Sequence, residues 1–254
     1  MAERENWKSK VVSSIFDLTE LFSVGRTIMR GAWGRVTAWA IADRLDVMFA
    51  SSNAVTIVDV GAFRGEWSRQ VATVLPVRRC ILIEPHPNSY QCLMESKSSL
   101  PAGALFLNVA VAEADHGNEM LYLTKNPVGT SLRAPEPGWL HEWTHVEQSR
   151  EIKTRRLDSL LDEYGFHRVD ILKVDAQGCD LEVLRSAGDF LRPDRIASVV
   201  VELNFRTFYS GQQPWWATVA LLQERGYQVS ALEQHFDSAG LIHWADALFV
   251  GEGA

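Results

Sequence analysis

Four short apolar runs, alternating with segments of helical character, constrain the fold more than any other feature of this sequence. The runs begin at Val55, Arg79, Val169 and Ile196 and read VTIVDV, RCILIEP, VDILKVD and IASVVVEL. Three of them lead into the helical segments GEWSRQVATVL, HPNSYQCLMESKSSL and CDLEVLRSAGDFL. Apolar strands that alternate with helices are typical of a parallel sheet covered on both faces. The sequence therefore predicts an α/β fold with a mostly parallel sheet.

The two ends of the chain differ from this pattern. Residues 1–52 look helical, and we expect them to cover a ligand site or to form a contact between two copies in a homo-oligomer. The later runs GYQVSALEQHF and LIHWADALFV predict an antiparallel pair of strands at the sheet edge. Residues 125–150 contain several prolines and glycines and predict an irregular excursion. We therefore expect an N-terminal helical segment, residues 1–52, and one domain, residues 53–254.

Composition narrows the class of partner. The 254 residues carry a formal net charge of −7, which disfavours a dedicated nucleic-acid binder. Three scattered cysteines do not form a disulfide framework. We find no signal peptide and no transmembrane run, so we expect a cytoplasmic protein that acts on a small molecule and not on a membrane.

The ends of the first two runs predict a nucleoside site. Gly61 allows a tight turn after the first run, and Gly65 stands at the expected start of the next helix. Glu84 ends the second run, where a carboxylate can accept hydrogen bonds from both hydroxyls of a ribose. A dinucleotide fingerprint would need glycine at the positions of Phe63 and Glu66, and no P-loop motif occurs. S-adenosylmethionine carries no phosphate and is compatible with this looser turn.

Four motifs in order resemble the FkbM family of S-adenosylmethionine-dependent methyltransferases. They are IVDVGAFRGEWS, IEPHP, TRRLDSLL and VDILKVDAQGCDLEVLRSAG, and together they cover about residues 55–203. The chain departs from the family pattern at two positions: Phe63 replaces an asparagine, and Gln177 replaces an acidic residue. The resemblance implies a class I methyltransferase fold, which is Rossmann-like.

The resemblance also implies roles for individual residues. Glu84 would hold the ribose of S-adenosylmethionine. Other residues would contact the rest of the methyl donor: Asp59, Gly61, Ala62 and Gly65 at the methionine part, Asn108, Val109 and Ala110 near the adenine, and Thr130 and Ser131 close to the site.

Methyl transfer to a hydroxyl requires alignment of the acceptor and removal of its proton. Asp175 follows the run VDILKV, so we expect it to face the methyl group as a catalytic residue. Asp175, Glu202 and Asn204 would lie at neighbouring strand ends and could hold Mg²⁺. The alternative is structural: Asp175 caps the next helix and Glu202 pairs with a basic residue.

The string HEWTH, residues 141–145, raises a different hypothesis. His141, Glu142 and His145 match H-E-x-x-H, which binds zinc when it lies on a helix. The string lies in the Pro/Gly-rich excursion, and the continuation H-x-x-G-x-x-H that would supply a third ligand is missing. Glu163 is a conceivable third ligand, but its segment matches the motif TRRLDSLL and the helix that follows it. His141 and His145 could instead belong to a lid over the acceptor, with one of them acting as a catalytic base.

Three functional hypotheses remain. The chain is an S-adenosylmethionine-dependent O-methyltransferase that acts on a small molecule or a sugar, a zinc-dependent hydrolase built on HEWTH, or a non-catalytic protein that keeps the methyltransferase fold. N-methylation is also compatible with the fold.

Overall fold

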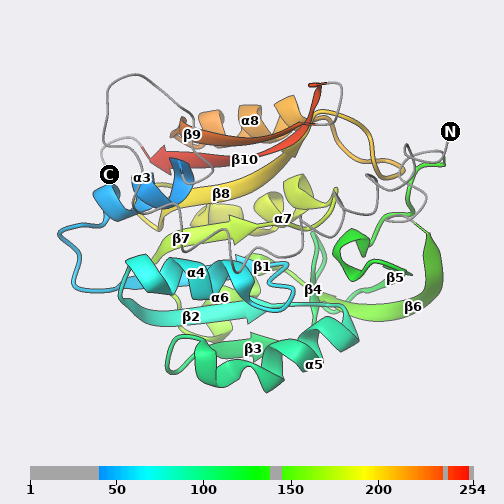
Figure 1. Ribbon diagram of the computed structural model, residues 1–254, viewed down its shortest axis with the longest axis horizontal. Helices are drawn as coiled ribbons and strands as arrows, with labels where there is room; N and C mark the ends of the chain where they lie inside the picture. The colour runs from blue at the N-terminus through cyan, green and yellow to red at the C-terminus, as the bar shows by residue number, and fades with distance from the viewer. Residues whose placement is uncertain (1–39, 138–144, 237–239, 252–254) are drawn as a thin grey trace, which may run out of the picture. The chain divides into compact units, whose positions relative to one another are not determined.

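The main sheet has the mixed architecture that the sequence predicts. The computed structural model describes residues 40–137, 145–236 and 240–251, which belong to one compact unit. Within these residues, seven strands form a sheet in the order β3-β2-β1-β7-β8-β10-β9 (Figure 1). The strands are β1 (Val55–Val60), β2 (Val77–Ile83), β3 (Leu105–Leu107), β7 (Val169–Val174), β8 (Ile196–Asn204), β9 (Tyr227–Phe236) and β10 (Ile242–Gly251).

Strand direction confirms the predicted pairing. The five strands from β3 to β8 run parallel to one another. Strand β10 pairs antiparallel with both β8 and β9, so the two C-terminal strands complete one side of the sheet. The α/β fold and the antiparallel C-terminal pair are therefore confirmed.

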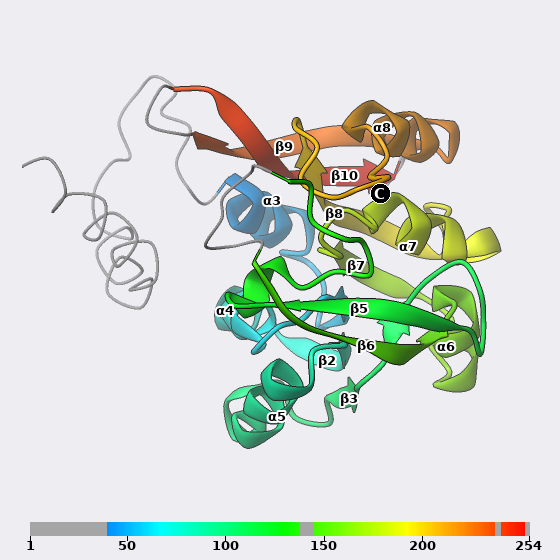
Figure 2. The same ribbon diagram turned by 90° about the vertical axis from the view of Figure 1, so that its right-hand side faces the viewer.

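Helices cover both faces of this sheet (Figures 1 and 2). Side chains alternate along each strand, so Ile57 belongs to the core on one face and Val58 to the core on the other. The first face is covered by α3 (Ala40–Met48), α4 (Glu66–Val74) and α5 (Pro87–Glu95), and the second by α6 (Leu157–Glu163), α7 (Asp180–Ser186) and α8 (Trp215–Glu224). Three short 3₁₀ helices are η1 (Lys97–Ser99), η2 (Pro127–Gly129) and η3 (Gly188–Phe190).

Helix α3 is the described part of the predicted N-terminal helical segment. It packs into the core of the first face through Ile41 and Leu45, and Phe49 continues this contact just beyond the helix. The rest of that segment, residues 1–39, lies outside the described residues, so its predicted role as a cover or oligomer contact stays a prediction. Among the helices that the structure describes, none has the length and apolar character needed to span a bilayer.

A second, smaller sheet was not expected from the sequence. Strands β4 (Ala110–Val111), β5 (Asn118–Thr124) and β6 (Val146–Arg155) associate in the order β4-β6-β5. The prediction of irregular structure over residues 125–150 is therefore wrong for residues 146–150, which belong to β6. Most side chains of β6 are exposed, so its sequence VEQSREIKTR lacks the alternation that identifies a half-buried strand.

Candidate functional site

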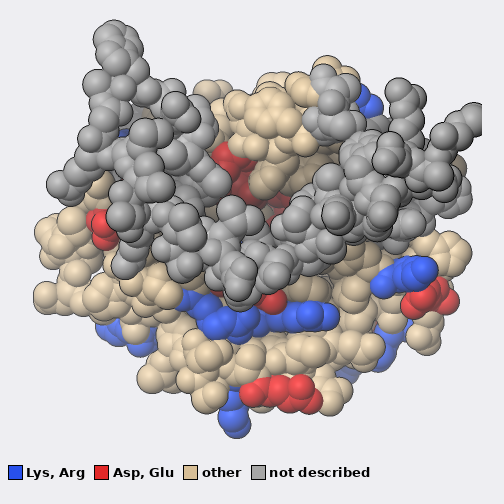
Figure 3. All heavy atoms as spheres, in the orientation of Figure 1, with Lys and Arg blue, Asp and Glu red and all other residues tan. Residues whose placement is uncertain are grey.

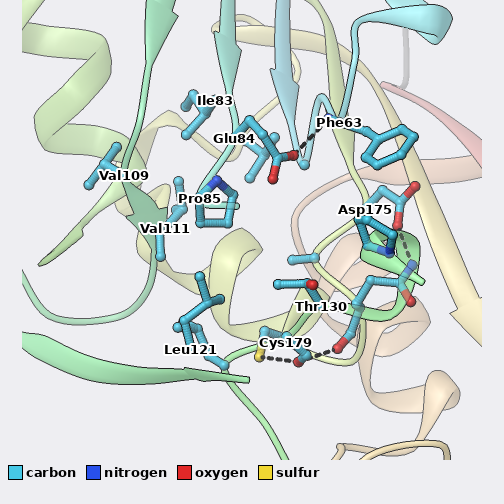
Figure 4. Close-up of a pocket in the computed structure, with 18 of the residues that line it drawn as sticks. Phe63, Ile83, Glu84, Pro85, Val109, Val111, Leu121, Thr130, Asp175 and Cys179 are labelled. Carbon is cyan, nitrogen blue, oxygen red and sulfur yellow. Dashed lines mark hydrogen bonds between the residues drawn. The ribbon is translucent and has the colours of Figure 1, made fainter. Parts of the chain in front are cut away.

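A pocket of about 160 Å³ lies beyond the carboxyl ends of β1, β2 and β7, where an open parallel sheet binds its ligand (Figure 4). The small sheet and η2 supply the opposite wall through Leu121, Pro127 and Val128. Many of the predicted site residues line this one cavity: Gly61, Glu84, Val109, Ala110, Thr130, Ser131 and Asp175. The topology thus brings together residues that lie more than a hundred positions apart in sequence.

The turn at Gly61 brings the chain after β1 into close contact with the chain after β7. Gly61 has φ 76°, and a Cβ atom built on it would lie 1.9 Å from the carbonyl oxygen of Asp175. The backbone N–H groups of Gly61 and Ala62 both donate to the carbonyl of Ile83, at 2.9 and 3.0 Å. Only glycine allows this approach, because any side chain would collide with the chain after β7.

Glu84 lies buried on the floor of the pocket, and its carboxylate is fixed by backbone donors. The N–H of Phe63 donates to Oε2 and the N–H of His86 to Oε1, both at 2.7 Å. Burial raises the pKa of Glu84 to about 7, against the opposing effect of these two hydrogen bonds. Each carboxylate oxygen keeps a further lone pair, so Glu84 can still accept hydrogen bonds from a ligand's hydroxyls.

Asn108 supports this arrangement without lining the pocket. Its Nδ2 donates to the carbonyl oxygens of Glu84 and Pro85, at 2.8 and 3.1 Å. It fixes the backbone that follows β2, while the neighbouring Val109 and Ala110 form part of the pocket wall.

Lys173 links the buried Asp59 to Asp175. Its Nζ lies 3.7 Å from Asp59 Oδ1 and 3.2 Å from Asp175 Oδ2. Burial alone would lower the pKa of Lys173, but the carboxylates of Asp175 and Asp59 outweigh it, and the pKa is raised. Asp59 is completely buried, accepts a hydrogen bond from Ser68 Oγ at 2.6 Å and lies outside the pocket lining. Asp59 is therefore connected to the pocket indirectly, because Lys173 links it to Asp175, which lines the pocket.

Gln177 holds the second oxygen of Asp175. Its Nε2 donates to Asp175 Oδ1 at 2.8 Å, and its Oε1 accepts from the hydroxyl of Tyr209 at 2.7 Å. The same hydroxyl lies 3.2 Å from the carbonyl oxygen of Gly129, and Ser131 Oγ donates to the carbonyl of Gln177 at 2.7 Å. These contacts join the turn after β7 to the segment around η2.

Asp180 fixes the turn between β7 and α7, a role that the sequence analysis did not assign. Its two oxygens accept hydrogen bonds from the N–H groups of Ala176 and Gly178. Burial raises the pKa of Asp180 to about 7. Helix-capping rules gave no signal for this role, because both donors precede α7 and do not belong to its first turn.

The predicted magnesium ligands do not assemble into a metal site. Within residues 40–137, 145–236 and 240–251, no group of three or more His, Cys, Asp or Glu side chains is arranged to hold a metal ion. Asn204 Nδ2 donates to Glu202 Oε1 at 2.9 Å, and Asp175 is engaged by Lys173 and Gln177. Burial, with the nearby Asp175, raises the pKa of Glu202 well above its usual range. The structure does not support the magnesium prediction.

The remaining predicted residues lie around the pocket or outside the described part of the chain. Ala62 is buried beside the turn, and Gly65 precedes α4 with φ 80°. His145 is exposed and directly precedes β6, so the described end of HEWTH is not helical. His141 lies outside the described residues, and the predicted catalytic roles of both histidines stay predictions.

Comparison with known proteins identifies the family. The model of the methyltransferase FkbM domain matches residues 59–229. This range contains the Gly61 turn, Glu84 and Asp175, the residues that surround the pocket. The match covers the whole of the small second sheet and the strands β2, β3, β7 and β8 of the main sheet.

Two curated relatives and one solved structure agree with this match. The 2-O-methyltransferase NoeI of Sinorhizobium fredii is 25% identical over 65% of this chain and 70% of its own length. The methyltransferase sdnD of Sordaria araneosa is 27% identical over 68% of this chain and 74% of its own. The crystal structure of methyltransferase FkbM from Methylobacillus flagellatus superposes with a TM-score of 0.51 at 15% identity, over 78% of this chain and 43% of that longer chain. The fold is therefore that of class I methyltransferases, and the chain belongs to the FkbM methyltransferase family.

Proposed function

We propose that this methyltransferase takes its methyl group from S-adenosylmethionine and transfers it to a hydroxyl of a small molecule or sugar. The observation that carries the proposal is the single pocket that the Gly61 turn, the Glu84 carboxylate and the Asp175 carboxylate share. These three groups come from the ends of three adjacent strands, β1, β2 and β7.

The chemistry of the pocket fits an adenosyl ligand. Ile83, Val109 and Val111 offer an apolar surface for a flat base at one end, and Glu84 offers acceptor oxygens for ribose hydroxyls next to it. The opposite end carries Phe63 and Asp175, as Figure 4 shows. The ring of Phe63 lies on the Asp175 side of the pocket.

S-adenosylmethionine would supply an already activated methyl group, so the main task of the protein is to align an acceptor. Asp175 is the residue that we propose for this task, because its carboxylate lines the pocket and its side chain is 31% exposed. Lys173 and Gln177 fix both of its oxygens. A carboxylate held in this way can accept a hydrogen bond from an acceptor hydroxyl and orient it toward the methyl group. It can also take up the hydroxyl proton as the new bond from oxygen to the methyl carbon forms and the bond from that carbon to sulfur breaks.

The choice of oxygen over nitrogen as the methylated atom rests on a relative. NoeI is named a 2-O-methyltransferase, and this chain covers 70% of its length. At 25% identity the relative supports a hydroxyl acceptor, and it does not identify the acceptor molecule.

Calorimetric titration with S-adenosylmethionine tests the first half of the proposal. We expect saturable binding at one site per chain, which Glu84→Ala weakens at least tenfold. Glu95→Ala is the matched control, because Glu95 is an exposed acid at the end of α5 and is not part of the pocket. Equal affinity of wild type and Glu84→Ala would contradict the assignment of the pocket.

Transfer of an isotopically labelled methyl group to a panel of sugars, phenols and amines tests the second half. Labelled ethers formed from the sugars or phenols support O-methylation, and labelled amines would contradict it. Binding of the methyl donor without transfer to any member of the panel would favour the non-catalytic alternative. Stoichiometric zinc that is lost on His141→Ala would favour the hydrolase.

A further inference from the structure

Phe63 has a backbone conformation that large side chains rarely adopt. Its φ is 50°, in the left-handed region, where asparagine and glycine are tolerated better than phenylalanine. The family pattern has asparagine at this position, so the phenyl ring replaces a residue that suits the backbone better. A strained residue retained in a pocket wall indicates a function for its side chain.

Two contacts involve Phe63, one at its backbone and one at its ring. The N–H of Phe63 donates to Glu84 Oε2 at 2.7 Å, which ties the turn to the pocket floor. The guanidinium of Arg64 lies over the ring, 4.9 Å from its centroid. The ring also lines the pocket, next to Asp175 and away from Val109 and Val111 (Figure 4).

The order of groups along the pocket determines which part of a ligand the ring meets. With the base against Val109 and Val111 and the ribose at Glu84, the sulfonium falls at the end formed by Phe63 and Asp175. An aromatic ring attracts a cation, and a carboxylate beside it adds to the attraction.

We infer that the Phe63 ring is a specificity-determining group that, together with Asp175, selects the positively charged methyl donor over its neutral product. The inference rests on the proposed function. S-adenosylhomocysteine is a suitable probe, because it differs from S-adenosylmethionine only by the loss of one methyl group and the positive charge. The ratio of the two dissociation constants therefore measures the recognition of the charge.

Calorimetric titration of both ligands into wild type, Phe63→Leu and Phe63→Tyr tests the inference. We expect Phe63→Leu to reduce the preference for S-adenosylmethionine by about 3- to 30-fold, the range of a cation–π contact. Phe63→Tyr keeps the aromatic ring and should keep the ratio of the wild type. Asp175→Asn should reduce the same ratio independently.

Phe63→Asn separates the effect of losing the aromatic ring from the effect of backbone strain. It should lose the ligand preference as Phe63→Leu does, since neither side chain is aromatic. In the ligand-free protein it should unfold about 2–4 °C above Phe63→Leu, because asparagine tolerates the left-handed conformation and leucine does not. A lower unfolding temperature for Phe63→Asn would overturn the argument from strain.

An unchanged ratio of dissociation constants in Phe63→Leu would overturn the inference itself. If both affinities fall by the same factor, the ratio is unchanged and the ring only shapes the pocket. If the wild-type protein binds neither ligand, the proposed function fails instead, so the two failures are distinguishable.

Discussion

The backbone N–H of Phe63 donates to the Glu84 carboxylate at 2.7 Å, so the turn after β1 and the acid after β2 form one unit. The carboxylate is 6% exposed, and burial raises its pKa to about 7. In the ligand-free protein near neutral pH, a substantial fraction of Glu84 therefore carries a proton. Two hydroxyl donors from a ribose would stabilise the ionised form and displace that proton.

We therefore predict that the affinity for S-adenosylmethionine depends on pH. Below about pH 7 binding must release a proton from Glu84, so affinity should fall up to tenfold per pH unit and level off above about pH 8. Titration calorimetry over about 1.5 pH units on either side of this pKa, in buffers of different ionisation enthalpy, measures both the affinity and the proton release. Glu84→Gln should bind more weakly and without this pH dependence; a dependence that survives in Glu84→Gln would assign it to another group.

The folding stability of the ligand-free protein depends on pH in the opposite direction to the ligand affinity: the contribution of Glu84 to stability falls as the pH rises. The folded pKa of Glu84 is raised from 4.5 to about 7, so the folded state binds more protons than the unfolded state between these values. The contribution of Glu84 to stability is therefore fully present below about pH 4.5 and is lost as the pH rises through 7.

Gly61→Ala should prevent or strongly impair folding. Its Cβ would lie 1.9 Å from the Asp175 carbonyl oxygen, and the φ of 76° adds backbone strain. We expect a loss of more than about 3 kcal/mol in the free energy of unfolding, measured by denaturant titration. Gly103→Ala is a matched control: its φ is 77°, but no atom lies within 4 Å of the added Cβ, so its loss should stay near 1 kcal/mol as expected for strain alone. Equal losses in the two variants would contradict the close approach of β1 and β7.

The sequence predicts the large sheet well because its strands are buried on both faces. The runs at Val55, Val169 and Ile196 are mainly apolar, and all three begin strands where expected. The turn glycine and the acids at strand ends could also be predicted, because the carboxyl ends of parallel strands meet at one edge.

The second sheet and the contacts between segments could not be predicted in the same way. Strand β6 is stabilised by backbone pairing with β5 while most of its side chains face solvent, so it leaves no apolar pattern. The hydrogen bonds of Tyr209 to Gly129 and Gln177 join segments 80 and 32 residues apart, a separation that residue types alone do not encode. The predicted metal site is not supported, because Asn204 donates to Glu202 and Gln177 donates to Asp175.

Tyr209→Phe tests whether the hydroxyl of Tyr209 organises the pocket wall. The variant keeps the ring that packs on Gly178 and removes the contacts to Gln177 Oε1 and the Gly129 carbonyl. We expect a loss of about 1–2 kcal/mol in the free energy of unfolding and several-fold weaker binding of S-adenosylmethionine, because η2 is no longer tied to the turn after β7.

Tyr227→Phe is the control for this variant. Tyr227 is buried and donates to the carbonyl of Ile196 at 2.8 Å, at the end of the sheet away from the pocket residues. It should lose similar stability while its affinity for the methyl donor stays that of wild type. Unchanged affinity in Tyr209→Phe would show that the tie stabilises the fold and does not shape the pocket.

Lys173→Met tests the buried charge between Asp59 and Asp175. Replacing the ammonium with an apolar group of similar length leaves Asp59, which is completely buried, without its countercharge. We expect a loss of about 3–5 kcal/mol in the free energy of unfolding at pH 8. The loss should become smaller as the pH falls, because burial raises the pKa of Asp59 and a protonated Asp59 needs no countercharge. Asp59→Asn in the same chain as Lys173→Met removes the uncompensated charge and should recover at least half of the lost stability, while keeping an acceptor for Ser68. Denaturant titrations of the two single variants and the double variant give the coupling free energy, and strictly additive losses would contradict the pairing of Lys173 with Asp59.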